Sequence, residues 1–328
     1  MKFSVLILGY LFLTTIAPAQ EKMMFGDTSR KGVPFSKDPH VIKFDGRYLM
    51  YFSIPPFSNK TGPDNGWNIG IAESSDLTNW KKIGEITPEG DYESKGLCAP
   101  CARVYNNKVH LFYQTYGNGK NDAICHAVSN NGISFTRDKS NPVFKPAGDW
   151  NCGRAIDAEV VKFNNRYFLY FATRDPDFVI QMQGVASAPI ITDFSKNDWK
   201  QAVDSPIMIP EYNWEGKCVE GASVNQRGNE LYMFYAGSYN NAPQQIGVAK
   251  SKDGIHWEKI SDQPFLKNGN PGDWNSSESG HPHIFEDSDG KTYLFYQGNN
   301  DNGKTWFISK VEVFWNKKGP YLKTNLNQ

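Results

Sequence analysis

The hydrophobic residues of this chain gather in short segments, in which aromatic and aliphatic side chains follow one another in a recurring order. Five segments share this pattern, and each is about six residues long, the usual length of a strand. They occupy residues 48–53, 109–114, 167–172, 231–236 and 292–297. The aromatic residues at their fifth positions are separated by 61, 58, 64 and 61 residues, and they are Phe52, Tyr113, Phe171, Tyr235 and Tyr296. One structural unit is therefore repeated five times.

Further strands flank each of these segments. A turn signal such as Asp45-Gly46 or Asn164-Asn165 precedes the segment, and an apolar strand such as Val41-Ile42 precedes the turn, which predicts a hairpin. In most units a third strand follows, as at residues 69–72 and 246–249, and leads through a polar turn to an outer strand. Four strands in each of five units predict an all-β, single-domain, five-bladed β-propeller. Helix is expected to be scarce, because no segment has a sustained apolar period of 3.6 residues.

The first 19 residues have a different character. Lys2 is followed by an apolar stretch over residues 5–16, and Ala17-Pro18-Ala19 forms a small-x-small cleavage site. This pattern predicts a secretory signal peptide over residues 1–19 and a propeller catalytic domain over residues 20–328. No later segment approaches the roughly 18 apolar residues that a membrane span needs. We therefore expect an exported protein, periplasmic or secreted, with no membrane insertion.

The charges of the chain balance, with 35 Lys and Arg residues against 35 Asp and Glu residues. Such a balance gives no long-range field that would gather phosphates, which argues against nucleic acid as a partner. Aromatic residues make up 14% of the chain and charged residues 21%, with no low-complexity tract. This composition is typical of a folded globular protein.

The cysteines allow three interpretations. Their number is odd, so at least one thiol is unpaired within the chain; they are Cys98, Cys101, Cys125, Cys152 and Cys218. Cys98-Ala-Pro-Cys101 has the spacing of a redox motif, but the βαβ context of such a motif is absent, and no second ligand pair stands at a spacing that suits zinc. Buried small hydrophobic residues, one disulfide, and a metal or redox function all remain open.

Ionisable residues occupy corresponding positions at the start of the innermost strand in four of the five units. Asp38 and Asp157 lie 14 residues before the fifth-position aromatic of their units, and Glu220 and His281 lie 15 residues before theirs. Because the first strand of each propeller blade lines the central axis, these side chains are expected to converge there. The simpler alternative is that the acids cap turns or pair with nearby lysines.

Converging carboxylates in a protein of balanced charge suit glycoside hydrolysis. One carboxylate activates a water molecule and another protonates the leaving oxygen, while repulsion between them raises the pKa of the acid. Two acids suffice for this chemistry. A third can hold the sugar and tune the proton donor.

Four short motifs carry a resemblance to a known family, and they are Asp38-Pro39, Ile156-Asp157, Glu220-Gly221 and Gly280-His281. Over all five blades the chain resembles glycoside hydrolase family 43 and related five-bladed propeller glycosidases. The resemblance implies that Asp38 is the general base, that Glu220 is the general acid, and that Asp157 orients this acid and modulates its pKa. It also implies an inverting mechanism, and it places His281 at the axis near a water molecule or a bound cation such as Ca²⁺. Ala158 and Ala222 stand where the family often has proline. This departure bears on which subfamily the chain resembles more than on the chemistry that the resemblance implies.

Other residues are candidates for contact with a sugar. Three tryptophans precede the residues at the blade mouths by six or seven positions, and they are Trp150, Trp214 and Trp274. They could stack on a sugar ring at the rim or fill gaps between blades. His40 shares a strand face with Asp38, so it could bind a sugar hydroxyl or serve as a structural histidine. His281 and His283 complete the set of expected substrate contacts.

These inferences predict an exported, inverting glycoside hydrolase that takes part in polysaccharide degradation and carbohydrate metabolism. We expect exo action on terminal arabinofuranosyl, xylosyl or galactose-type sugars of oligosaccharides, with no required cofactor and at most a structural Ca²⁺ at the axis. One alternative is a propeller glycosidase of the anhydro-galactosidase type, in which His281 or His283 replaces Glu220 as the acid. Another is a non-catalytic carbohydrate-binding propeller.

Overall fold

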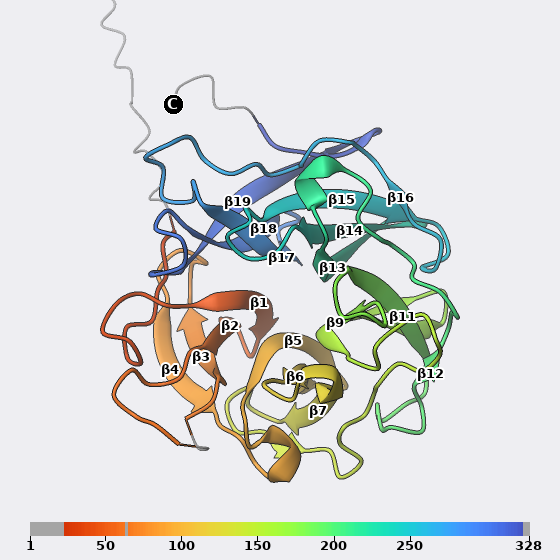
Figure 1. Ribbon diagram of the computed structural model, residues 1–328, viewed down its shortest axis with the longest axis horizontal. Helices are drawn as coiled ribbons and strands as arrows, with labels where there is room; N and C mark the ends of the chain where they lie inside the picture. The colour runs from red at the N-terminus through yellow and green to blue at the C-terminus, as the bar shows by residue number, and fades with distance from the viewer. Residues whose placement is uncertain (1–22, 63–64, 324–328) are drawn as a thin grey trace, which may run out of the picture.

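The computed structural model describes residues 23–62 and 65–323, in which the chain forms five antiparallel sheets of four strands each. Figure 1 shows these sheets as five blades around a central axis. Blades 1 to 3 consist of β1 (Lys37–Phe44), β2 (Arg47–Ile54), β3 (Asn68–Ser74), β4 (Lys81–Ile86), β5 (Leu97–Tyr105), β6 (Lys108–Thr115), β7 (Ile124–Ser129), β8 (Thr136–Arg137), β9 (Ile156–Phe163), β10 (Arg166–Arg174), β11 (Gln181–Pro189) and β12 (Lys200–Gln201). Within each sheet neighbouring strands are consecutive in sequence, and this confirms the predicted five-bladed β-propeller.

The last two blades follow the same order. They consist of β13 (Val219–Arg227), β14 (Glu230–Gly237), β15 (Gln245–Ser251), β16 (Glu258–Lys259), β17 (Glu278–Glu286), β18 (Thr292–Asn299), β19 (Phe307–Asn316) and β20 (Gly319–Tyr321). The described helices are three single 3-10 turns, η1 (Asp91–Glu93), η2 (Gly119–Asn121) and η3 (Asn213–Glu215). In the described part of the chain, no helix has the length and apolar character to cross a membrane. The predicted signal peptide lies outside the described residues.

Tight turns between the first two strands of a blade set the register. In blade 1, Asp45 and Gly46 both have positive φ angles, 50° and 75°, as a two-residue hairpin turn requires. Asn164 and Asn165 do the same in blade 3, with φ angles of 45° and 61°. Asp, Asn and Gly tolerate this backbone conformation better than other residues. The turn signals in the sequence therefore mark real hairpins.

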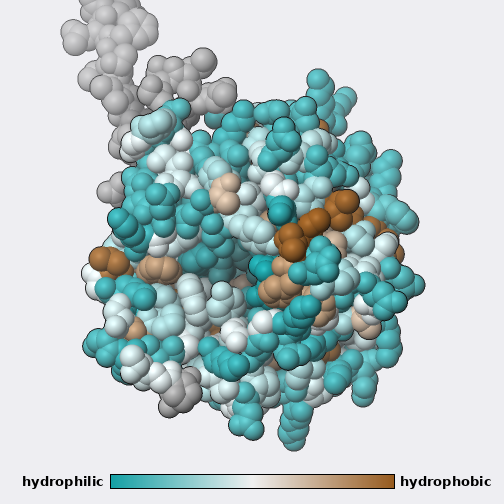
Figure 2. Space-filling model, viewed as in Figure 1, coloured by the Kyte–Doolittle hydropathy of each residue, from teal (hydrophilic) through white to brown (hydrophobic). Residues whose placement is uncertain are grey.

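The innermost strands β1, β5, β9, β13 and β17 surround the axis (Figure 1). Each of the five carries an irregularity near its start, where two residues oppose one residue of the second strand. Such bulges redirect side chains locally. Figure 2 shows a hollow with hydrophilic walls at the centre of the ring.

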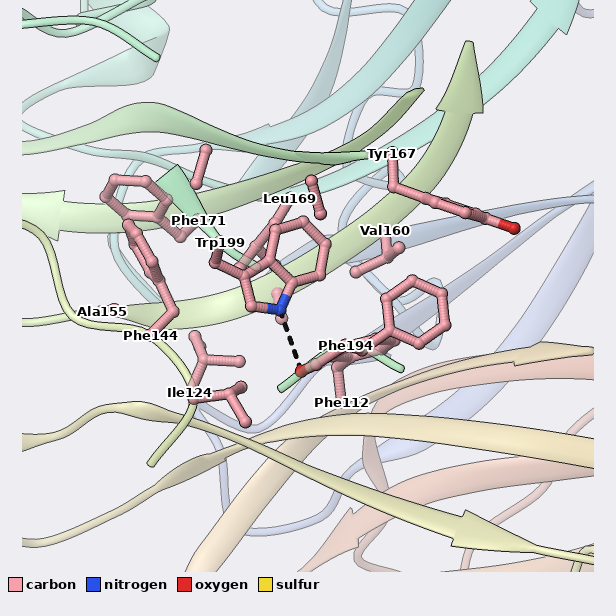
Figure 3. Close-up of a cluster of buried hydrophobic side chains, with 14 of the residues drawn as sticks. Phe112, Ile124, Phe144, Ala155, Val160, Tyr167, Leu169, Phe171, Phe194 and Trp199 are labelled. Atoms are coloured by element: carbon pink, nitrogen blue, oxygen red, sulfur yellow. Dashed lines mark hydrogen bonds between the residues drawn. The ribbon is translucent and has the colours of Figure 1, made fainter. Parts of the chain in front are cut away.

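Hydrophobic side chains fill the space between neighbouring blades. Figure 3 shows the cluster between blades 2 and 3, where Phe112 from β6 meets Val160 from β9 and Leu169 from β10. The buried indole of Trp199 donates a hydrogen bond to the carbonyl of Phe194, with a length of 3.2 Å. The repeating aromatic segments of the sequence supply this core, which holds the blades in fixed positions around the axis.

The ring is closed by the N-terminal segment. Phe25 forms two backbone hydrogen bonds with Ile308 in β19, and the hydroxyl of Ser309 donates to the carbonyl of Met23. A segment that precedes blade 1 is thereby attached to blade 5.

None of the five cysteines forms a disulfide. Four are buried and Cys152 is half-buried. Burial raises the pKa of Cys101 and Cys125, which keeps both thiols protonated. The interpretation as small buried residues therefore agrees with the structure, and the disulfide interpretation does not.

Candidate active site

Five positions at the bulges of the innermost strands are structurally equivalent. Each has a left-handed backbone, with φ angles between 42° and 59°, and together we call them the mouth ring: Asp38, Ala99, Asp157, Gly221 and His281. Glu220 is not one of them, because it precedes the bulge and pairs with Ala236. The predicted register therefore requires a correction, since Glu220 lies one residue before the position that Asp38 and Asp157 share. His281 lies 15 residues before its aromatic partner because the hairpin of blade 5 has a longer turn.

A cavity of about 140 Å³ opens at the mouth ring. Asp38, Asp157, Glu220 and His281 all line it, so the structure brings the three predicted acids and the predicted axial histidine together. The other lining residues are Lys37, Trp67, Cys98, Gln114, Tyr116, Arg154, Ile156, Arg174, Gln181, Tyr239 and Asn240.

Asp38 is held from the neighbouring fifth blade. Its backbone N–H donates to the side-chain oxygen of Gln297 over 2.9 Å, and its carboxylate oxygen Oδ1 lies 3.2 Å from Nδ1 of His281. The left-handed backbone, with φ of 51°, suits an aspartate. The carboxylate is therefore oriented towards the cavity and keeps an oxygen for a water molecule.

Asp157 is held in the same way from blade 2, because its N–H donates to the side-chain oxygen of Gln114 over 2.6 Å. Its side-chain oxygen Oδ2 is buried and has no hydrogen-bond partner among the described residues. Burial raises the pKa of Asp157 to about 7; the nearby His281 acts in the opposite direction, while Glu220 and Asp38 raise the pKa further. Asp157 therefore titrates near neutral pH.

Glu220 is fixed by two neutral amides. Gln244 donates to its Oε1 over 2.7 Å, and Gln181 donates to its Oε2 in a short contact. Neither amide carries a charge, so they orient the carboxyl group without neutralising it. This orientation by uncharged donors suits a group that must exchange a proton.

A second ring of side chains lies two residues further along the same strands. We call it the inner ring, and its members are His40, Cys101, Glu159, Ser223 and His283. All five are buried, and none lines the cavity. His40 and His283 were expected to contact the substrate, but they lie beneath the cavity with their rings 3.7 Å apart. Burial lowers the pKa of both histidines, so both are neutral at neutral pH.

Hydrogen bonds within the inner ring account for its polar atoms. Glu159 accepts the backbone N–H of Val224 over 2.8 Å and forms an ion pair with Arg103, while its other oxygen lies 3.4 Å from Nε2 of His40 and 3.3 Å from the thiol of Cys101. Nδ1 of His40 accepts the N–H of Ala102 over 3.2 Å, so the proton of the neutral ring is on Nε2.

The donor atoms of His40, Cys101 and Glu159 lie within 4.8 Å of one another, as metal ligands do. However, a metal on Nε2 of His40 would move the ring proton to Nδ1, against the N–H of Ala102. Ca²⁺ prefers six to eight oxygen ligands, and the inner ring offers one carboxylate that Arg103 already neutralises. The donor set therefore fits a hydrogen-bonded network better than a cation site.

The three tryptophans do not line the cavity. Trp214 stacks on Tyr235 with ring centres 6.0 Å apart, Trp274 packs against Tyr296 in a tilted arrangement at 5.5 Å, and Trp150 packs against Gly184. The positions agree with the alternative that these tryptophans fill gaps within the fold. Stacking of these tryptophans on a sugar gains no support from the cavity and stays a prediction.

The aromatic side chains of the cavity are Trp67, Tyr116 and Tyr239. Tyr116 and Arg174 each follow the fifth-position aromatic of their blade by three residues, and Tyr239 follows its aromatic by four. Sequence reasoning missed Tyr116 and Tyr239 because they lie just beyond the end of a second strand, and Trp67 because it lies in the connection that precedes β3. The repeat register could have identified these positions, three or four residues after the fifth-position aromatic. It could not have shown which of their side chains turn towards the cavity.

Solved structures of glycoside hydrolases are similar to this fold. A thermostable family-43 glycoside hydrolase superposes with a TM-score of 0.71 and 20% identity, covering 93% of this chain and 97% of that one. An exo-1,5-α-L-arabinanase from a bovine ruminal metagenomic library has a TM-score of 0.63 and 18% identity over 89% and 98% of the two chains. An α-L-arabinofuranosidase from Lactobacillus brevis has a TM-score of 0.65 and 18% identity over 88% and 94%. At these identities the likeness concerns the fold.

Two comparisons rest on sequence. A β-1,2-mannobiose phosphorylase from Thermoanaerobacter sp. (strain X514) is 30% identical over 128 residues, which is 34% of this chain and 40% of the length of that relative. The sequence profile of the glycosyl hydrolases family 43 matches residues 32–320, a span that contains the three acids of the cavity, His281 and all of the five blades except the last residue of β20. The chain thus belongs to glycosyl hydrolases family 43.

Proposed function

We propose that this glycoside hydrolase is exported and inverting, and that it removes terminal arabinofuranosyl, xylosyl or galactose-type sugars from oligosaccharides. The observation that carries the proposal is the meeting of Asp38, Asp157 and Glu220 on one cavity. The buried inner ring lies beneath this cavity and closes it at one end, which favours exo action. The names of the arabinanase and arabinofuranosidase with a similar fold support the choice of a terminal pentose.

In the proposed mechanism Asp38 removes a proton from water, which attacks the anomeric carbon in a single displacement. Glu220 donates its proton to the leaving oxygen, and its two amide partners hold the carboxyl group in place during the transfer. Asp157 is a positioning residue, whose charge acts on the neighbouring carboxyl groups. His281 contacts Asp38 at 3.2 Å, so it orients the base, and His283 lies beneath the cavity. Neither placement favours a histidine as the acid.

The test is hydrolysis of a panel of nitrophenyl glycosides and of plant and algal oligosaccharides, with the anomer of the first product followed by NMR. Asp38→Asn provides the inactive reference. Asp45→Asn is its matched control, because Asp45 lies in the same blade, is exposed, and also has a left-handed backbone with φ of 50°. Retention of anomeric configuration would contradict the inverting mechanism, and binding without turnover would favour a carbohydrate-binding propeller.

We further propose that catalysis needs no metal, since the carboxylate and the imidazoles of the inner ring have partners within the protein. EDTA is expected to leave kcat/KM unchanged. A loss of activity that added Ca²⁺ restores, in a protein that stays folded, would instead assign a cation to the axis.

A further inference from the structure

The cations that line the cavity differ in their partners. Arg154 is paired with Asp122, since both Nε and Nη2 lie 3.2 Å from a carboxylate oxygen of this residue. Lys37 and Arg174 form no ion pair with any described carboxylate, although both are only partly exposed. Three acids share the cavity with them, yet Asp38 is paired with His281 and Glu220 with two amides. Neither Lys37 nor Arg174 therefore has a direct carboxylate partner among the described residues, although the three acids line the same cavity.

The side chain of Arg174 is held in place by two aromatic rings and a hydrogen bond. Its guanidinium lies over the ring of Phe178 at 4.4 Å and over the ring of Tyr239 at 5.1 Å. Its Nε donates to Gln181 over 3.0 Å, and Gln181 in turn donates to Glu220. Stacking between two rings fixes the plane of the guanidinium. Its Nη2 donates no hydrogen bond to any described atom.

The neighbouring acid is turned away from this guanidinium. Asp175 follows Arg174 directly, but its Oδ1 accepts the backbone N–H groups of Val179 and Ile180 over 2.7 and 3.0 Å. The carboxylate of Asp175 therefore stabilises the turn between β10 and β11 and does not pair with Arg174. Arg174 lines the cavity without a counter-ion. Tyr239 braces the same hairpin, since its hydroxyl donates to the carbonyl of Val179 over 2.9 Å.

We propose that Arg174 is the anchor of an oxyanion subsite beside Glu220, with Lys37, whose Nζ donates to Asn240 over 3.2 Å, contributing a second positive charge to the cavity. The ligand chemistry is a planar or tetrahedral oxyanion, for which the fork of an arginine is the preferred partner. The leading source of this oxyanion is the substrate itself, as the carboxylate of a uronic acid; free inorganic phosphate is the second source. The inference refines the proposed function, on whose sugar-binding cavity it rests.

The chain offers a matched pair of variants to test this subsite. Arg174→Met removes the charge and keeps an apolar stem against the two rings. Lys120→Met is the control, because Lys120 also lies near Phe178, at 5.8 Å, but donates to the carbonyl of Pro176 and does not line the cavity. Loss of the Arg174 contact to Gln181 can disturb Glu220 and slow every substrate. The measured quantity is therefore the ratio between an acidic sugar and its neutral counterpart, in which this shared loss cancels.

The experiment measures binding of galacturonic acid against galactose and of glucuronic acid against glucose, by calorimetry and as inhibition of aryl glycoside hydrolysis. The acidic sugar of at least one pair should bind more tightly, and Arg174→Met should reduce this preference by about tenfold to a hundredfold, the range of a charge-assisted hydrogen bond. Lys120→Met should leave the preference unchanged. Inorganic phosphate is titrated in parallel, and phosphate binding that depends on Arg174, without a preference for acidic sugars, would assign the subsite to free phosphate.

Equal affinities for acidic and neutral sugars, together with no Arg174-dependent phosphate binding, would overturn the inference. This failure differs from failure of the proposed function. Neutral glycosides would still be hydrolysed in the first case, whereas in the second case calorimetry would detect sugar binding without any turnover.

Discussion

Two rings of side chains face the propeller axis, two residues apart on the same five strands, and they differ in how their polar atoms are satisfied. In the inner ring, Glu159 has an arginine, a backbone N–H, an imidazole and a thiol as partners. In the mouth ring, Asp157 has a buried oxygen without any partner among the described residues. Both rings contain carboxylates and histidines, so residue type alone does not separate them.

The difference shows how one scaffold supports both stability and chemistry. The inner ring is sealed, so its charge is neutralised inside the protein and its histidines are held neutral by burial. The mouth ring is open on one side, and its acids keep unsatisfied capacity for substrate and water. Incomplete hydrogen bonding at a buried carboxylate costs stability, and active sites are where such costs are retained.

The largest expected effect comes from Asp38→Asn in the mouth ring. Because the base is needed whatever the leaving group, kcat/KM should fall about 10²–10⁴-fold on an aryl glycoside and on a natural oligosaccharide alike. Asparagine tolerates the positive φ of 51°, so the free energy of unfolding should change little. Full activity in this variant, with Asp45→Asn as control, would mean that the base lies elsewhere.

Glu220→Gln should have an effect that depends on the leaving group. A natural sugar leaves poorly without a proton, so the variant should lose about 10²–10⁴-fold in kcat/KM, whereas an activated aryl group should show a much smaller loss. The comparison requires kinetics on one substrate of each type. Equal losses on both would exclude Glu220 as the acid.

For the inner ring the expectation is reversed, with loss of stability and little loss of activity. Glu159→Gln removes the counter-ion of Arg103, whose side chain is 32% exposed, so we expect a decrease of about 1–3 kcal/mol in the free energy of unfolding. Glu286→Gln is the matched control: it breaks a 3.2 Å pair with Arg227 at the surface and should cost less than about 1 kcal/mol. Urea denaturation measures both. A Glu159 variant of normal stability but without activity would give the inner ring a catalytic role.

The effect expected for Asp157 depends on pH and vanishes in acid. Its pKa in the folded protein, about 7, lies above the ordinary 3.8, so the folded state binds more protons than the unfolded state between these values. Stability is therefore lost as the pH rises through this window, and Asp157→Asn should remove the loss, with a gain of about 1–3 kcal/mol at pH 8 and none near pH 4. Denaturation at the two pH values tests this, and an unchanged pH slope would show that Asp157 does not carry the proton.

The sequence predicted the fold because the propeller repeats its aromatic strand at a nearly constant spacing. It predicted the convergence of Asp38, Asp157 and His281 for the same reason, since all three occupy one bulge position. The offset of Glu220 was hidden, because counting residues does not reveal which of two neighbours enters the bulge. Arg174 was not predicted as a site residue, because the repeat register does not show which side chains at the end of a second strand turn towards the cavity.

The tryptophans show a different limit. Trp214 lies where a side chain on Gly237 or Gly247 would stand, since a Cβ atom there would come within 2.3 or 2.8 Å of its ring. Trp274 lies in the same way against Gly298, at 2.7 Å. The slots for these rings are created by glycines on later strands, so no local pattern around a tryptophan predicts whether it packs inwards or faces a substrate.

The attachment of the N-terminal segment to β19 also governs the order in which the molecule can be completed. The hydroxyl of Ser309 and the carbonyl of Met23 are 286 residues apart in sequence, so the segment that enters the ring first has no partner there until almost the whole chain has been made. Contacts of such separation form late, because a long loop must close before they are gained. The four blades that precede this step can pack in the order of synthesis, whereas closure awaits the fifth. Between the synthesis of β19 and the docking of Phe25, the edge of this strand stays open to other chains.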